Sequence, residues 1–245
     1  MTALLLPLAL LIPISSSLVQ TGDREFYAIN YPVAITLYSE ALAADPDNPA
    51  IHWRLARVYV TSGEVAPESE REQIYRKAES HARRCIALDS TIAEGHTWLA
   101  AALGNIALFV GGSTKIKLAN EIKAELDHSL ALSEEDDVTW SILGSFYYSV
   151  GAVSWFERQM ANIFLSSIPE GGFEESEYAF RRAIAIAPDI PRHRFELGKV
   201  YLEWGREEDG YRMFESALQL APTSAGDTVA RRVMQEYLRE RDPER

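Results

Sequence analysis

The chain has 245 residues, of which 47% are hydrophobic, and a formal net charge of −12 at pH 7. This length suits one large domain or a short array of repeats. An acidic surface repels phosphate backbones, so the charge argues against nucleic-acid binding. The single cysteine, Cys85, excludes an internal disulfide. Alanine, leucine and glutamate are plentiful and long β-branched runs are absent, which predicts an all-α protein.

Residues 1–20 are predicted to be a signal peptide or an apolar anchor. Ala3 to Ile14 is an apolar run of 12 residues, shorter than the roughly 20 that a membrane-spanning helix needs. Small serines follow it, as at the end of a secretory signal, although the first Arg or Lys is Arg24. We expect an exported protein, periplasmic or extracellular. Membrane association through this segment and a cytoplasmic location are the alternatives.

Residues 24–241 are predicted to form a single domain of helical hairpins. Phe26 to Asp45 has the period of an amphipathic helix and is expected to be the second half of a hairpin. The expected units are a half-repeat at 24–48, repeats at 49–92, 93–136, 137–190 and 191–224, and a cap helix at 225–241. We expect Val229, Val233 and Leu238 of the cap to face inward, because terminal repeats need a cap with a polar outer side.

The clearest hairpin is Pro191 to Ser224. Small and apolar residues recur at helical spacing along both of its predicted helices: Leu197, Gly198 and Tyr201 in the first, and Gly210, Phe214 and Ala217 in the second. This pattern resembles the tetratricopeptide repeat, whose period is about 34 residues. Such a hairpin cannot bury its apolar face alone. The resemblance therefore implies a right-handed superhelix of stacked helical hairpins.

Three repeats contain inserted segments. Gly63 to Cys85 spans 22 positions where Gly205 to Ala217 spans 12, a difference of 10. We place these extra residues, and a second set of 10 in the next repeat, in the turns between helices. The third insertion, around Trp155, is predicted to be a continued amphipathic helix. It could cover the groove, dock on a membrane, or pack on its own neighbours.

Four stretches resemble something narrower than tetratricopeptide repeats in general. They are HWRLARVY at His52–Tyr59, GGSTKIKLANEIKAELDHSL at Gly111–Leu130, LGSFYYSVGAVSWFERQMA at Leu143–Ala161 and GGFEESEYAFRRAI at Gly171–Ile184. The chain is similar in these places to the regulator of microtubule dynamics family. The resemblance implies microtubule association in animals and, in one branch, phospholipid binding and transfer at organelle contact sites; the family also occurs in bacteria. The apparent export signal and the acidic charge disfavour microtubule binding here, since tubulin is itself acidic.

The first helices of stacked hairpins line the concave face of the superhelix. The predicted inward residues are Trp53 and Arg57, then Thr97, Ala101 and Asn105, then Ser141, Ser145 and Tyr148, and finally Arg192, Phe195 and Lys199. A small polar middle between ends that pair a cation with an aromatic ring predicts a groove for an anionic, partly apolar ligand. We expect a partner peptide, with phospholipid as the alternative. In the competing interpretation, Arg57 and Lys199 pair with nearby acidic residues.

A second candidate cluster comprises Lys115, Lys117 and Asn120, with Lys123, in the second helix of the second repeat. Either these lysines contact an anion at the groove entrance, or Asn120 bonds the inserted turn. None of the five histidines forms a metal-binding spacing, and no nucleophile-elbow motif occurs. The sequence therefore predicts a non-catalytic binding protein without cofactor or metal.

Overall fold

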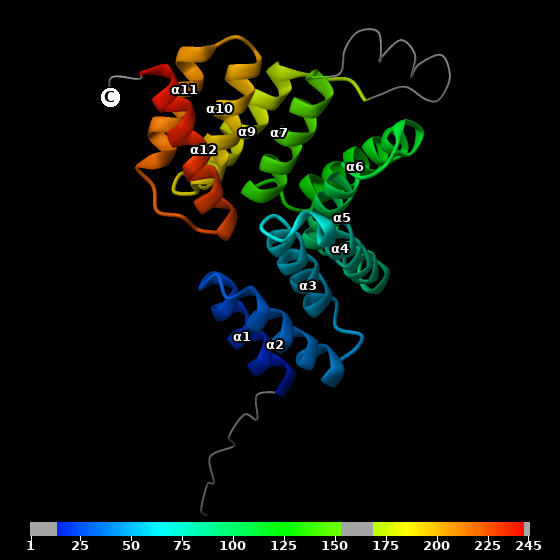
Figure 1. Ribbon diagram of the computed structural model, residues 1–245. Coiled ribbons are helices and arrows are strands. Elements are labelled where there is room, and N and C mark those ends of the chain that lie inside the picture. Colours follow the sequence, from blue (N-terminus) through cyan, green and yellow to red (C-terminus); the bar gives the residue numbers. More distant parts are fainter. Residues whose placement is uncertain (1–13, 153–168, 243–245) are drawn as a thin grey trace, which may run out of the picture.

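The computed structural model describes residues 14–152 and 169–242, whose secondary structure is entirely helical (Figure 1). Consecutive helices pair into five hairpins, and a last helix follows them. The helices are α1 (Ile14–Tyr27), α2 (Tyr31–Ala44), α3 (Pro49–Gly63), α4 (Glu68–Leu88), α5 (Ala93–Ile106), α6 (Gly112–Leu132), α7 (Asp137–Gly151), α9 (Phe173–Ile186), α10 (Pro191–Glu203), α11 (Glu207–Leu218) and α12 (Ala225–Arg241). The all-α helical-repeat superhelix predicted from the sequence is confirmed.

The four predicted repeat starts are the first residues of α3, α5, α7 and α10. Local chemistry explains two of these boundaries. Asn48 caps α3, its side chain accepting a hydrogen bond from Ala50 N at 3.0 Å, and Pro49 has no N–H to leave unsatisfied in the first turn. Asp136 caps α7 in the same way, through Val138 N.

Glycines allow the two helices of a hairpin to approach closely. A Cβ atom on Gly144 would lie 2.7 Å from the ring of Phe180, and one on Gly198 would lie 2.5 Å from the ring of Phe214. Real Cβ atoms do not come this close, so the aromatic ring of the second helix fits only against glycine. These rings are fully buried, as the repeat pattern predicted.

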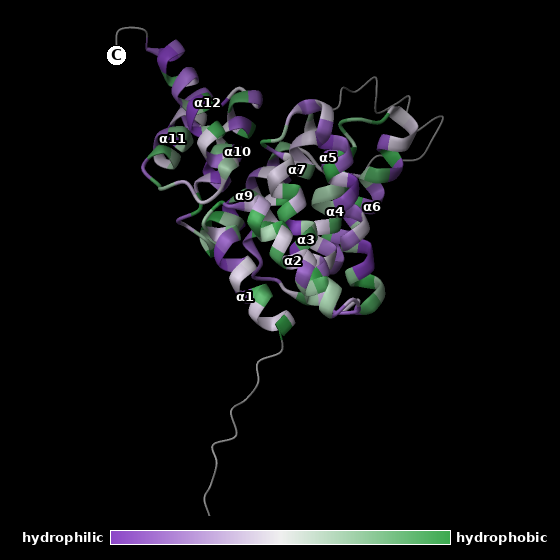
Figure 2. Ribbon diagram, turned by 60° about the horizontal axis from the view of Figure 1, so that its bottom comes forward, coloured by the Kyte–Doolittle hydropathy of each residue, from purple (hydrophilic) through white to green (hydrophobic). Residues whose placement is uncertain are grey.

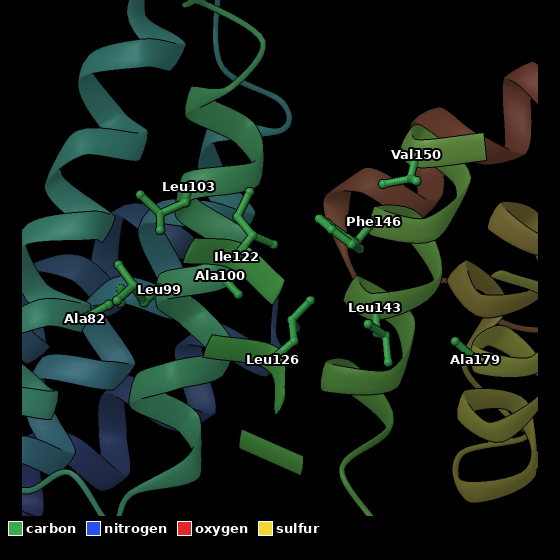
Figure 3. Close-up of a cluster of buried hydrophobic side chains, with 11 residues drawn as sticks. Ala82, Leu99, Ala100, Leu103, Ile122, Leu126, Leu143, Phe146, Val150 and Ala179 are labelled. Atoms are coloured by element: carbon green, nitrogen blue, oxygen red, sulfur yellow. The ribbon is translucent and has the colours of Figure 1, made fainter. Parts of the chain in front are cut away.

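The largest buried cluster runs through successive repeats from α3 to α9. Figure 3 shows Ile122 and Leu126 of α6 pointing toward Leu143 and Phe146 of α7. The core is therefore continuous between hairpins, because no hairpin buries its apolar stripe alone. Figure 2 shows that the C-terminal part of α12, the last helix, is largely hydrophilic.

The N-terminal unit is a complete hairpin. The sequence predicted one helix from Phe26 to Asp45, but the chain turns at residues 28–30, where Ile29 has a positive φ of 63°. The preceding residues form α1, whose Gly22 packs on the ring of Tyr38. The predicted half-repeat was wrong because α1 lies partly inside the stretch assigned to a signal peptide. Residues 1–13 lie outside the described part of the chain, and export stays a prediction.

The first two insertions lengthen helices instead of turns. Helices α4 and α6 each contain 21 residues, and the turns before them cover only 64–67 and 107–111. In α4 the added turns are good helix: Glu68 and Glu70 lie in the positive first turn, and Arg76 pairs with Glu72 at 2.9 Å. Of the third insertion, residues 153–168, including Trp155, lie outside the described residues, so its predicted helix is untested.

The cap helix α12 has the predicted bounds, but its buried face is rotated. Ala230 and Met234 are 5% and 2% exposed and pack on α10 and α11, with Val233 and Leu238 at the edge. Val229, predicted to face inward, is 50% exposed. Among residues 14–152 and 169–242, no helix is both long enough and apolar enough to cross a membrane.

Candidate functional site on the inner face

The first helices of the hairpins form one row. Helix α3 packs on α5, α5 on α7, and α7 on α10, while α1 reaches α3 through side-chain contacts. This row is the inner face of the superhelix, and it carries most of the residues predicted to bind a ligand. Its two ends and its middle differ in character.

At the α1–α3 end, the predicted cation Arg57 is already paired. It is 7% exposed, donates to Asp23 Oδ1 at 2.9 Å and to Tyr38 Oη at 3.1 Å, and lies 3.9 Å from the ring centre of Phe26. Arg54 shares the same carboxylate at 3.0 Å. For Arg57, the competing interpretation of an acidic partner describes the structure.

Trp53 lies beneath these two arginines. The guanidinium of Arg54 is 4.2 Å from the centre of the Trp53 ring and that of Arg57 is 5.0 Å away. Stacked cations of this kind stabilise the aromatic face while covering it. Trp53 therefore belongs to the packing between α1 and α3 as much as to an exposed surface.

At the other end, Arg192 and Lys199 converge on Glu196. Arg192 Nε donates to Glu196 Oε1 at 2.8 Å, and Lys199 Nζ lies 2.6 Å from Glu196 Oε2. Burial acts to raise the pKa of Glu196, but Arg192 and Lys199 outweigh it and hold the pKa below its usual range. Glu196 is therefore ionised at neutral pH and offsets both predicted cations.

Arg192 also joins the two ends of the row. Its Nη1 and Nη2 donate to the two oxygens of Glu64, just after α3, at 3.1 and 3.3 Å. Burial lowers the pKa of Arg192, yet Glu196 and Glu64 together raise it above the usual value. This forked pair links residues 128 positions apart. No sequence pattern indicated it, because it depends on the curvature of the whole stack.

The start of α12 completes this closure. Ala225 N donates to Tyr31 Oη of α2 at 3.2 Å, and Ala225 packs against the α1–α3 cluster. Gly226 lies directly over Glu64 and Arg192. Figure 1 shows the N-terminal end of α12 between α10 and the α1–α3 end. The superhelix thus bends back until its last helix, α12, touches α2 and α3.

The cap also covers one predicted ligand contact. Phe195 is 8% exposed and packs with Phe214, Ala230 and Met234, under α12. The prediction that Phe195 faces an open groove was wrong, because α12 lies across α10 and does not only close the end of the stack. Tyr148, half-buried, packs 6.2 Å from the ring of Phe173.

The middle of the row is small and polar: Ala101 and Ser141 are 7% and 9% exposed, and Asn105 and Ser145 are half-buried. Among residues 14–152 and 169–242, no atom beyond its chain neighbours and its own helix backbone lies within 4 Å of a Cβ atom placed on Gly104. Asn105 donates its Nδ2 to Ala101 O at 2.9 Å, and its Oδ1 has no partner among the described residues. Ser145 donates to Ser141 O at 3.2 Å. This is the part of the predicted groove in which the structure leaves room for another molecule.

Thr97, predicted to face inward, lies between repeats instead. It is 1% exposed, and its hydroxyl is 2.7 Å from both Ser129 Oγ and Thr139 Oγ1. A small hydroxyl can satisfy two neighbours in a space too tight for a larger side chain. Thr97 therefore joins α5, α6 and α7 and is not a ligand contact.

Lys115, Lys117 and Asn120 lie on the exposed first half of α6. In Figures 1 and 2, α6 lies on the opposite side of the molecule from α10 and α12. The structure therefore does not bring this cluster to the end of the groove that carries Arg192 and Lys199. Asn120 Nδ2 donates to Ile116 O at 3.0 Å, a bond within its own helix.

Comparison with known proteins shows the family. The family model described as "Regulator of microtubule dynamics protein 1-3" matches residues 16–242. The chain belongs to this family. Regulator of microtubule dynamics protein 1 of Bos taurus is 26% identical over 69% of the chain and 53% of its own length. The human protein 2 of the family is 25% identical over 76% of the chain and 46% of its own length.

The chain thus spans about half the length of the curated family members it matches. Among solved structures, a thermophilic tetratricopeptide-repeat protein of Thermus thermophilus superimposes with a TM-score of 0.70. It is 19% identical and is matched over 91% of this chain and 98% of its own. Both the family resemblance and the tetratricopeptide fold predicted from the sequence are confirmed.

Proposed function

We propose that this family member is a non-catalytic interaction scaffold, which holds an extended peptide with an acidic group over the middle of its inner face. The observation that carries the proposal is the space above Gly104 of α5, into which no described neighbouring side chain reaches within 4 Å of a Cβ position. A peptide backbone needs close approach and hydrogen-bonding groups. Asn105 Oδ1 and the serine hydroxyls supply them there.

Lys199 is the cation best suited to an acidic group of the peptide. Its ammonium has three N–H donors, of which Glu196 occupies one, and its side chain is 35% exposed. Arg57, in contrast, is buried against Asp23. We therefore assign the anion contact to the α10 end of the row.

Two other functions are less favoured. Phospholipid transfer needs an enclosed apolar cavity, whereas the open part of the inner face is small and polar. Relatives are named regulators of microtubule dynamics, but a net charge of −12 opposes long-range attraction to the large acidic surface of tubulin, whereas a short peptide with one acidic group needs only the local contact with Lys199. We therefore propose a peptide, and not a phospholipid or tubulin, as the ligand.

The proposal is tested by selecting binders from a random peptide library with free C-terminal carboxylates and measuring their affinity by fluorescence anisotropy. Gly104→Leu should weaken binding at least about tenfold by filling the open space. Gly112→Leu is the matched control, because Gly112 also faces open space but begins α6. Lys199→Gln should weaken the binding of peptides that carry a carboxylate, and should leave unchanged the binding of the same peptides made without acidic residues and with an amidated C-terminus.

Equal affinity in the Gly104→Leu and Gly112→Leu variants would remove the inner face as the site. Unchanged affinity of the selected peptides for the Lys199→Gln variant would remove the role of Lys199. Native mass spectrometry of the purified chain gives the lipid alternative its own test, since co-purified phospholipid would support it.

A further inference from the structure

The α5/α6 hairpin brings together two histidines and a glutamate that have no part in the proposed peptide site. His96 is on α5, and Glu125 and His128 are on α6, three positions apart and so on one helix face. One ligand atom from each residue lies within 4.8 Å of the other two. The rings of His96 and His128 are 5.5 Å apart.

Counting protons shows that a second proton or a metal ion must lie between His96 and Glu125. His96 Nε2 lies 3.0 Å from Ser90 O, and a carbonyl oxygen only accepts, so Nε2 carries a hydrogen. In a neutral imidazole, Nδ1 is then a bare acceptor. It lies 2.6 Å from Glu125 Oε2, another acceptor. Two acceptors at this distance repel each other unless a second proton or a metal ion lies between them.

The preceding repeat provides a comparison, because the residues 44 positions earlier are His52, His81 and Arg84. His52 donates Nε2–H to Pro46 O at 3.2 Å, as His96 does to Ser90. There, however, His52 Nδ1 faces His81 Nδ1 at 3.1 Å, and a single proton on His81 satisfies both rings. Arg84 brings a fixed cation, 2.6 Å from Asp47. The two rings of this hairpin therefore satisfy each other without a metal ion.

We propose that His96 Nδ1, the Glu125 carboxylate and a ring nitrogen of His128 bind one divalent transition-metal ion, with zinc the best match. Imidazole and carboxylate are ordinary zinc ligands at about 2.0–2.2 Å, which places neighbouring ligand atoms about 3.3 Å apart. The exposed His128 ring closes the remaining distance by rotating about its side-chain bonds. Water completes the coordination.

The surroundings of His96 suit a metal ligand. Its ring is 6% exposed, and the hydrogen bond to Ser90 fixes both its orientation and its tautomer, with Nδ1 directed at the site. The Glu125 side chain is 18% exposed, so an ion enters from solvent past His128. The bound ion cross-links α5 to α6.

The test uses the full chain after chelation and dialysis, titrated with ZnCl2 in an isothermal calorimeter. We expect one zinc ion per chain, a rise in melting temperature, and the visible absorption of a four-coordinate ion when Co2+ replaces zinc. Glu125→Gln and His128→Gln should each weaken zinc binding at least about tenfold. His128 is exposed, so its substitution leaves the fold intact, as circular dichroism would verify.

The control is His81→Gln, at the position of α4 that corresponds to Glu125. It should leave zinc affinity and stoichiometry unchanged. Zinc binding that survives both Glu125→Gln and His128→Gln would overturn the proposal. So would the absence of binding at millimolar zinc, which would mean that a proton alone lies between His96 and Glu125.

Discussion

Two glycine-to-alanine substitutions test the closure of the superhelix by α12. A Cβ atom on Gly226 would clash with Glu64 Oε2 and lie 2.9 Å from Arg192 Nη1, so one or both of these side chains must shift and their pairing is disturbed. The pair is 33% and 27% exposed. Hydrogen bonds between charged groups contribute roughly 1.5–3 kcal/mol when buried and less when solvent screens them. We expect Gly226→Ala to lower the free energy of unfolding by about 1 kcal/mol.

Gly104→Ala is the matched control. Gly104 lies within α5 and faces open space, so alanine should raise the free energy of unfolding by about 0.5–1 kcal/mol through helix propensity. For a chain of this size, 1 kcal/mol corresponds to about 2–4 °C in melting temperature. Differential scanning calorimetry should therefore show the two variants shifted in opposite directions. If Gly226→Ala is stabilised as much as Gly104→Ala, α12 does not close onto Glu64 and Arg192 in solution.

Three further outcomes follow from the same geometry. Arg192→Glu should repel Glu64 and increase the radius of gyration in small-angle X-ray scattering. Arg241→Glu, which breaks an exposed ion pair with Glu208 and a contact with the Tyr211 ring near the C-terminus, should not. The pKa of Glu196 in the folded protein lies below its unfolded value of 4.5. The ionised side chain therefore stabilises the fold above pH 4.5, and this stabilisation is lost as the pH falls through the folded pKa. Urea titrations should give different free energies of unfolding for Glu196→Gln and wild type at neutral pH, and the two values should converge in acid. Burial raises the pKa of Cys85 to about 12, so iodoacetamide should label Cys85, followed by mass spectrometry, only after unfolding.

Repeat boundaries could be predicted because they depend on local spacing. Gly198 and Phe214 are 16 positions apart, and in the structure they form the contact that sets the distance between two helices. Gly22 and Tyr38 have the same spacing and the same contact. That signal was present in the sequence and would have shown that the first hairpin is complete. It was missed because α1 begins in an apolar, serine-containing stretch that also suits an export signal.

Local spacing could not predict that the expected ligand-binding cations are already paired with acidic residues. The register correctly placed Arg57 and Arg192 on first helices, but their acidic partners, Asp23 and Glu64, come from other repeats. Which acid reaches which cation depends on how far the stack curves, and small rotations at each interface add up along the chain. Spacing within a single repeat contains no information about that sum.

Comparison between repeats nevertheless separates architecture from function. Positions that match in the two long hairpins have the same structural role: His52 and His96 each tie a first helix to the loop before it. Where the two hairpins have different residues at matching positions, those residues are not required for this contact between helix and loop. His81 in one repeat and Glu125 in the next occupy the same place against an identically held imidazole. The fold tolerates either residue, so packing alone does not explain a carboxylate there, and the excess acceptor that it creates is the reason to look for a metal ion in α5/α6 and not in α3/α4.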